Sequence, residues 1–257
     1  MKLGMPQLYE YSTVEENLIL AKELSLDFVE LNLNFAYCRS EMESGKLCGL
    51  FEKFGLEATL HFYDEADFAS YDEVADAYLS LLSKYASLGK GYVKIINIHL
   101  ISGPVVTISG IKNYIYEKEF DEYAKRLLTN LKKAEKICRD NGIKMVLENT
   151  DHLAKFMKKS YAILADAGYH FNYDIGHDCV DGDYLFNEVF PNLDIAFDEM
   201  HIHDSDTKNC HLAIGCGNTD FEKYRKYYKD AYIVLEVKQS SDLVVSVPRF
   251  KGLLEKP

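Results

Sequence analysis

Val146-Leu147-Glu148 is the first of four short apolar segments that end in a potential metal ligand; the others are Phe171-Asn172-Tyr173-Asp174, Met200-His201-Ile202-His203 and Val234-Leu235-Glu236. Buried apolar runs seldom finish on a carboxylate or an imidazole without a reason. Four such endings in succession, separated by long gaps, indicate that the ends meet at one point. A divalent metal ion is the simplest group that would hold two glutamates, an aspartate and a histidine together there.

The same segments belong to a longer alternation of strands and helices. Eight strands are expected, at Lys2–Met5, Phe28–Leu33, Ala58–Phe62, Tyr92–His99, Lys144–Glu148, His170–Asp174, Glu199–His203 and Ile233–Val237. Strands that alternate with helices form parallel sheets through right-handed crossovers, and eight such units close most naturally into a (β/α)8 TIM barrel. Active sites of this fold lie at the C-terminal ends of the strands, where the predicted ligands fall.

Helix boundaries are marked by capping and periodicity. Ser12 to Glu15 and Ser70 to Glu73 have capping-box spacing, and Gly89 follows an apolar helical stripe. The longest helix is expected over about Glu119–Asp140. The C-terminal segment Ser240–Leu254 contains Val244-Val245-Ser246-Val247-Pro248, which is a weak helical pattern for the eighth unit.

Composition favours one globular domain over residues 1–257. The chain has 47% hydrophobic residues, and no linker or low-complexity tract divides it. The net charge of −12 disfavours nucleic acid and anionic membranes as partners, and the five arginines do not cluster in sequence. Six cysteines without a CxxC pair, no apolar signal segment and no membrane span predict a cytoplasmic protein. Homo-oligomers stay open, because exposed barrel helices often pair.

Histidines supply further candidate site residues. Six of the eight lie at or just after predicted strand ends: His61, His99, His177, His201, His203 and His211. Period-two alternation sends His201 and His203 to the same side of their strand, so one could bind metal while the other orients a ligand or a neighbouring carboxylate. Lys238 lies just beyond Glu236 and could neutralise the carboxylates or bind a substrate oxygen. Glu30 would need polar partners if it faced the barrel interior.

These motifs resemble the xylose-isomerase-like TIM-barrel superfamily, which contains sugar isomerases and epimerases and also zinc-dependent AP endonucleases. The resemblance is carried, in order along the chain, by Glu148-Asn-Thr150, Asp174-Ile-Gly-His177, His201-Ile-His-Asp-Ser205, His211-Leu-Ala-Ile-Gly215-Cys-Gly217, Asp220-Phe221 and Leu235-Glu236. It implies a (β/α)8 fold with a divalent metal at the barrel mouth. It leaves the reaction open, because the branches share the ligand set.

In the epimerase branch, the resemblance implies one Mn, Mg, Co or Zn ion held by Glu148, Asp174, His201 and Glu236. The two glutamates would also act as the acid/base pair through an enediolate, with His177 contacting a small sugar, sugar phosphate or keto-polyol. From their positions in the sequence, His203 and Lys238 are further candidates for contact with the substrate. In the endonuclease branch, His61, His99, His177 and His211 would expand the site to as many as three zinc ions for a phosphodiesterase or phosphatase.

Three departures count against DNA cleavage. Asn209 stands where the endonuclease branch pairs its third-site histidine with an aspartate, and an amide is a poorer zinc ligand than a carboxylate. The loop after His61 contains Asp64, Glu65 and Asp67, which would repel a phosphate backbone. Arginine is also scarce. The leading hypothesis is therefore a metal-dependent sugar isomerase or epimerase, with the zinc phosphodiesterase or phosphatase as the alternative.

Overall fold

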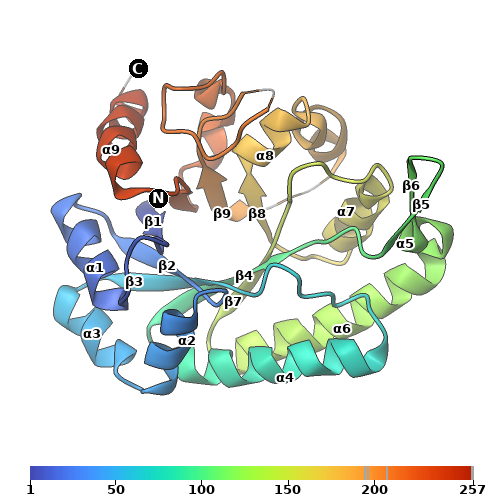
Figure 1. Cartoon of the computed structure of the whole chain (residues 1–257), viewed down its shortest axis with the longest axis horizontal. Coiled ribbons are helices and arrows are strands. Elements are labelled where there is room, and N and C mark those ends of the chain that lie inside the picture. Colours follow the sequence, from blue (N-terminus) through green and yellow to red (C-terminus); the bar gives the residue numbers. More distant parts are fainter. Residues whose placement is uncertain (194, 196, 207, 256–257) are drawn as a thin grey trace.

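The structure, a computed structural model, describes residues 1–193, 195, 197–206 and 208–255. Within these residues, parallel strands form a closed barrel in the order β1-β10-β9-β8-β7-β4-β3-β2 (Figure 1). The barrel strands are β1 (Lys2–Pro6), β2 (Phe28–Asn32), β3 (Glu57–His61), β4 (Val93–His99), β7 (Lys144–Glu148), β8 (Phe171–Asp174), β9 (Phe197–Ile202) and β10 (Tyr232–Leu235). Each overlaps one of the eight expected strands, so the (β/α)8 prediction is confirmed.

Helices connect the strands on the outside of the barrel. They are α1 (Val14–Glu23), α2 (Ala36–Glu43), α3 (Leu47–Phe54), α4 (Asp72–Gly89), α5 (Ile115–Lys118), α6 (Phe120–Asp140), α7 (Met157–Asp166), α8 (Ile175–Val180) and α9 (Ser240–Leu254). Short helical turns also occur: η1 (Leu185–Val189), η2 (Phe190–Asn192) and η3 (Phe221–Tyr227). The two longest helices, α4 and α6, pack side by side (Figure 1). None of the helices in the described part combines the length and apolar character needed to cross a membrane.

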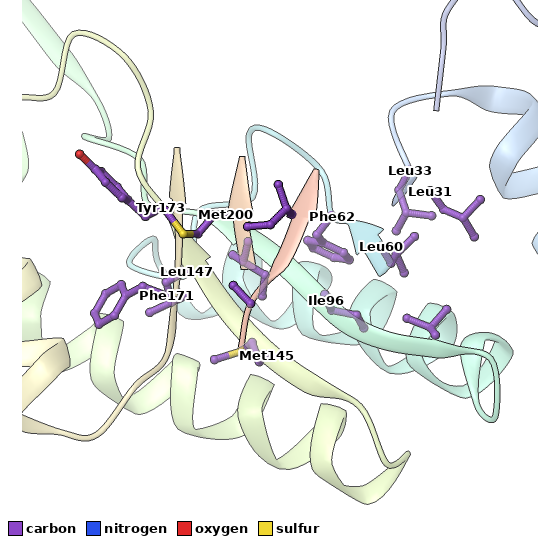
Figure 2. Packing of buried hydrophobic residues seen from close by; sticks show 14 of the residues in the cluster. Leu31, Leu33, Leu60, Phe62, Ile96, Met145, Leu147, Phe171, Tyr173 and Met200 are labelled. Carbon is purple, nitrogen blue, oxygen red and sulfur yellow. The ribbon is translucent and has the colours of Figure 1, made fainter. Parts of the chain in front are cut away.

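The barrel strands carry apolar side chains on their outer face, and polar side chains occupy several positions of their inner face toward the C-terminal ends. Leu60 of β3, Leu147 of β7 and Met200 of β9 are fully buried between the sheet and its surrounding helices (Figure 2). Each such side chain contributes about 1.5–3 kcal/mol on burial. Because successive side chains point to opposite faces, their neighbours Glu148 and His201 face the barrel interior. The outer face thus stabilises the fold and leaves the inner positions for polar groups.

Both capping boxes expected from the sequence were placed wrongly. At α1 the box is shifted by one residue: Thr13 Oγ1 accepts from the Glu16 amide at 3.3 Å, and Glu16 Oε2 accepts from the Thr13 amide at 2.9 Å. Burial of Val14 selects this register, because Val14 becomes the first helical residue. At α4 the N-cap is Tyr71, which makes no side-chain cap hydrogen bond. Ser70 instead donates its amide to the Asp67 carbonyl in the preceding turn, at 3.3 Å.

Two elements differ from the simple sequence pattern. The weak C-terminal segment forms α9 despite the internal Pro248, because Leu243, Val247 and Phe250 are buried and tertiary packing outweighs helix propensity. A two-stranded antiparallel sheet of β5 (Val105–Ile108) and β6 (Ile111–Tyr114), which the strand pattern did not indicate, is inserted after β4 and projects from the barrel (Figure 1).

Candidate metal centre

The four predicted ligands come from four adjacent strands of the barrel. Glu148 ends β7, Asp174 ends β8, His201 lies in β9 and Glu236 follows β10. Nδ1 of His201 lies 2.9 Å from Glu148 Oε1, 3.3 Å from Glu236 Oε2 and 3.9 Å from Asp174 Oδ2. All four residues are buried. The structure therefore brings the predicted ligands together at the C-terminal mouth of the barrel.

The donor atoms of this cluster fit a divalent cation. His201 Nδ1 and Glu236 Oε2 are buried and have no hydrogen-bond partner among the described residues. The other imidazole nitrogen, Nε2, lies 3.1 Å from Glu30 Oε1. Burial alone would lower the pKa of His201, but the surrounding carboxylates raise it, so the metal-free imidazole carries a proton on both nitrogens. A metal ion that replaced the Nδ1 proton would leave Nε2–H donating to Glu30, which is the arrangement of a metal-binding histidine with a carboxylate partner.

Electrostatics also favours a cation. Carboxylate oxygens of Glu148, Asp174 and Glu236 lie within 4.8 Å of one another. At an effective dielectric constant of about 20, each pair of such charges repels by roughly 3–4 kcal/mol. Burial alone would raise the pKa of Glu148, but the charges of His201 and His99 hold that pKa well below its usual value. The carboxylate is therefore ionised at neutral pH and available as a ligand.

Glu148 has a second set of neighbours on its other oxygen. Nε2 of His61 and Nε2 of His99 lie 3.4 and 3.3 Å from Glu148 Oε2, and 3.0 Å from each other. The side-chain amide of Asn97 also donates to this oxygen. Since one carboxylate contacts the main cluster through Oε1 and two imidazoles through Oε2, Glu148 has the geometry of a bridging ligand.

Asp174 is held in place by its surroundings. Asn149 accepts from the Asp174 amide and donates to the Asp174 carbonyl, both at 2.9 Å. His203 is fully buried, with Nε2 3.0 Å from Asp174 Oδ1. Its Nδ1 accepts from the His211 amide at 2.8 Å, so the proton of a neutral His203 lies on Nε2 and is donated to Asp174. His203 thus contacts a predicted ligand.

The remaining predicted residues line the outer edge of the cluster. His177 Nε2 lies 3.6 Å from Asp174 Oδ2, and His211 Nδ1 lies 3.5 Å from Glu236 Oε2. Burial lowers the pKa of His211 to about 4, so this imidazole is neutral at pH 7. Lys238 Nζ lies 2.8 Å from Glu236 Oε1, and its side chain is 57% exposed. These groups form the solvent-facing border of the centre.

Several polar residues below the centre were not assigned from the sequence. Glu30 accepts from His201, and the buried Glu199 lies two residues before His201 on β9. The buried side chains of Thr59, Asn172 and Glu199 have atoms without a hydrogen-bond partner among the described residues. Their signal in the sequence was a polar residue at the inward position of an otherwise apolar strand, as in Phe28-Val29-Glu30-Leu31.

No family model and no curated protein matches this sequence. Solved structures match it by fold. A D-tagatose 3-epimerase-like protein superposes with a TM-score of 0.78 at 22% identity, covering 99% of this chain and 97% of its own. An L-ribulose 3-epimerase superposes with a TM-score of 0.73 at 15% identity, and the match covers 99% of this chain and 94% of the epimerase. A 3-keto-D-glucoside 4-epimerase from E. coli superposes with a TM-score of 0.72 at 14% identity, and the match covers 98% of each chain. These likenesses establish a shared barrel fold.

Proposed function

We propose that this protein is a divalent-metal-dependent epimerase or isomerase of a small sugar, sugar phosphate or keto-polyol. The convergence of Glu148, Asp174, His201 and Glu236 on one buried point carries the proposal. The match in fold to sugar epimerases, which spans nearly the whole chain, supports it.

The four ligands would hold one divalent ion. Three carboxylates and one imidazole accept Mn, Mg, Co or Zn. When bound, such an ion polarises a carbonyl or hydroxyl oxygen of the substrate and so acidifies the adjacent C–H bond. The buried, unpartnered atoms His201 Nδ1 and Glu236 Oε2 support its placement here.

The chain's own residues would then move the proton. Glu148 and Glu236 come from strands that flank β8 and β9, so their carboxylates border the centre from two sides. One glutamate, as the carboxylate, removes the proton next to the carbonyl to give an enediolate, and the other, once protonated from solvent, returns a proton to the opposite face. Asp174 and His201 fix the position of this pair.

Neighbouring side chains would bind and orient the substrate. His177 and Lys238 lie at the solvent-facing border, where each can contact a substrate oxygen. His203 is too deeply buried to reach a substrate lying at that border, and its contact with Asp174 favours a positioning role.

A second candidate is a zinc-dependent phosphodiesterase or phosphatase. The contacts of His61 and His99 with Glu148 Oε2 favour it, because they would complete a second metal site beside the first. The surrounding charge disfavours it for DNA, since Asp64 Oδ1 lies 3.5 Å from His61 Nδ1. A third zinc at His177 and His211 would not gain a ligand from Asn209, because the side-chain amide of Asn209 donates to Asp206.

Deuterium exchange tests the leading proposal directly. In D2O, the metal-loaded protein should catalyse the incorporation of solvent deuterium into a ketose such as D-tagatose, D-allulose or L-ribulose, or into the phosphate of such a ketose. The deuterium should appear at the epimerised carbon. Glu148→Gln and Glu236→Gln should abolish incorporation with an unchanged circular dichroism spectrum. Glu52→Gln, an exposed control on α3, should exchange normally. Hydrolysis of phosphate esters without exchange would favour the second candidate.

Metal content separates the two candidates independently of substrate. Protein purified without chelator or added zinc should carry about one divalent ion per chain under the epimerase proposal. Two or three zinc ions per chain, of which one is lost when His61 and His99 are both replaced by Ala, would show that these two histidines are ligands. Protein that binds no divalent ion at neutral pH would contradict both candidates.

A further inference from the structure

A second group of potential metal-binding side chains lies beside the centre and contains none of its four proposed ligands. Asp151, His177 and Cys210 each offer one ligand atom, and these atoms lie within 4.8 Å of one another. They come from three different segments: the loop after β7, the first turn of α8 and the loop between β9 and η3. Asp151 has an exposed side chain, whereas His177 and Cys210 are partly buried.

His177 has an unused donor atom at this position. Its amide donates to Asp174 Oδ1 at 2.7 Å, and its Nε2 lies 3.6 Å from Asp174 Oδ2. These contacts fix the imidazole at the edge of the first centre. Its Nδ1 is buried and has no hydrogen-bond partner among the described residues. A buried nitrogen without a partner is unfavourable in a finished structure, and a ligand would satisfy it.

The loops that carry the other two residues are held in place. The amides of His152 and Leu153 donate to Asp181 at 3.2 and 2.9 Å, so the loop of Asp151 is attached to the end of α8. Next to Cys210, the Asn209 amide group donates to both carboxylate oxygens of Asp206 at 3.1 Å. Asn209 is therefore engaged elsewhere, whereas Cys210 offers a ligand atom within 4.8 Å of one of His177.

We propose that Asp151, His177 and Cys210 form a separate zinc site at the rim of the metal centre. Thiolate, imidazole and carboxylate are ligands that zinc accepts at about 2.0–2.3 Å in tetrahedral geometry, and the present spacing needs only a small closure to reach it. Three protein ligands leave a fourth position for water. The thiolate selects zinc and related soft ions over Mg and Mn, which the oxygen-rich first centre also accepts.

The site has a consequence for catalysis that rests on the proposed function. Zinc at this position would engage His177, the residue proposed to contact the substrate. We expect micromolar zinc to raise the KM of the Mn- or Mg-loaded enzyme, and Cys210→Ser to remove this effect. Binding itself does not depend on the reaction, so it is tested first.

Cobalt spectroscopy tests the site without an activity assay. Co²⁺ added to Mn-loaded protein should produce the near-ultraviolet charge-transfer absorption of a thiolate–cobalt bond, which no ligand of the first centre can give. Cys210→Ser should remove this absorption, and Asp151→Asn should weaken cobalt binding by at least about tenfold, the loss seen when even an outer partner of a metal ligand is removed. The control Cys216→Ser changes an exposed cysteine and should leave the absorption intact.

A second measurement uses the unaltered protein, in case a variant fails to fold. Zinc should protect Cys210, but not Cys216, from alkylation by iodoacetamide, as mapped by peptide mass spectrometry. The proposal is overturned if cobalt gives no thiolate absorption, if the absorption survives Cys210→Ser, or if Asp151→Asn binds cobalt unchanged. None of these results would bear on deuterium exchange at the first centre.

Discussion

His201 shows how one residue can be prepared for metal binding by its neighbours. Glu30 lies 3.1 Å from Nε2, and three carboxylates surround Nδ1. The two nitrogens thus have different roles, set by the carboxylate behind the ring rather than by the histidine itself. Under the proposed function, Glu30 would therefore be a partner of the centre without being a ligand.

Replacing Glu30 by Gln should weaken metal binding by roughly 10–100-fold, the usual effect of removing the partner of a ligating histidine. The amide oxygen of glutamine is a weaker acceptor for Nε2–H than a carboxylate oxygen, and the substitution removes a negative charge next to His201. Affinity would be measured by competition with a chromophoric chelator. Glu52→Gln is the control, and equal affinities for the two variants would contradict an orienting role for Glu30.

Glu199 predicts a pH dependence of stability. Burial, reinforced by the charge of Glu30, raises the pKa of this carboxyl from 4.5 to about 8 in the folded, metal-free protein. Between these values the unfolded chain releases the proton while the folded chain keeps it. The contribution of Glu199 to stability is therefore intact below about pH 4.5, falls as the pH rises toward 8, and is constant above.

Glu199→Gln should remove this component. In chelator-treated protein, the free energy of unfolding of the variant minus that of the unaltered chain should rise between about pH 5.5 and pH 7.5, by at most about 1.4 kcal/mol per pH unit. Urea unfolding at both pH values measures the difference. A difference that is independent of pH would show that Glu199 is ionised in the folded protein.

The start of α8 couples an element to the centre. Asp174 is its N-cap and accepts from the His177 amide, so the residue that ends β8 also begins the helix. Gly176 allows the first turn to pass close to His203. A Cβ atom at Gly176 would lie 1.9 Å from His203 Cε1 and 2.2 Å from Nδ1. His203 cannot move away readily, because it is fully buried between Asp174 and the His211 amide.

Gly176→Ala should therefore destabilise the protein by about 1–3 kcal/mol, as overpacked sites do, and should also weaken metal binding by displacing His203 from Asp174. Chemical unfolding and chelator competition measure the two effects. Gly49→Ala in α3 is the matched control, because a Cβ there meets nothing within 4 Å. Helix propensity should make that variant up to about 1 kcal/mol more stable. Normal metal affinity of Gly176→Ala would contradict the coupling.

At the scale of the whole molecule, barrel closure assembles the centre. β7, β8, β9 and β10 are neighbours, and β3 and β4 continue the series on the side of β7. A metal ion bound at the proposed centre would therefore tie together strands that begin more than 80 residues apart, and it should stabilise the folded barrel as a whole. Removing the metal should expose the mutual repulsion of the three carboxylates.

A saturating metal should accordingly raise the melting temperature. At a free metal concentration of about 100 times the Kd, the gain is about 2.7 kcal/mol, or roughly 5–10 °C for a chain of this size. Differential scanning calorimetry with and without Mn²⁺ measures it. Asp174→Asn should lose most of the shift, whereas Asp140→Asn, an exposed control at the end of α6, should keep it. An equal shift in both variants would place the bound metal elsewhere.

Much of the fold, and the convergence of the four predicted ligands, could be predicted from the sequence. Strand positions were predictable because apolar outer faces must be buried, as for Leu147 and Met200, and this requirement leaves a local pattern. Glu148, Asp174, His201 and Glu236 were recognisable because each ends or follows such a pattern. The α1 capping box was misplaced because Ser12 and Thr13 both have a glutamate three residues later, and only burial of Val14 decides between them.

Other features depend on distances between segments that are remote in sequence. Nothing local to Glu30 indicates that it accepts from His201, 171 residues away. The same is true of the Asp151, His177 and Cys210 group, whose members come from two loops and the first turn of α8. The sequence alone determined which residue types stand at the strand ends, because strand periodicity is local. Only the tertiary structure decided which nitrogen of His201 faces the three carboxylates and which groups hold it there, because closing the barrel sets those contacts.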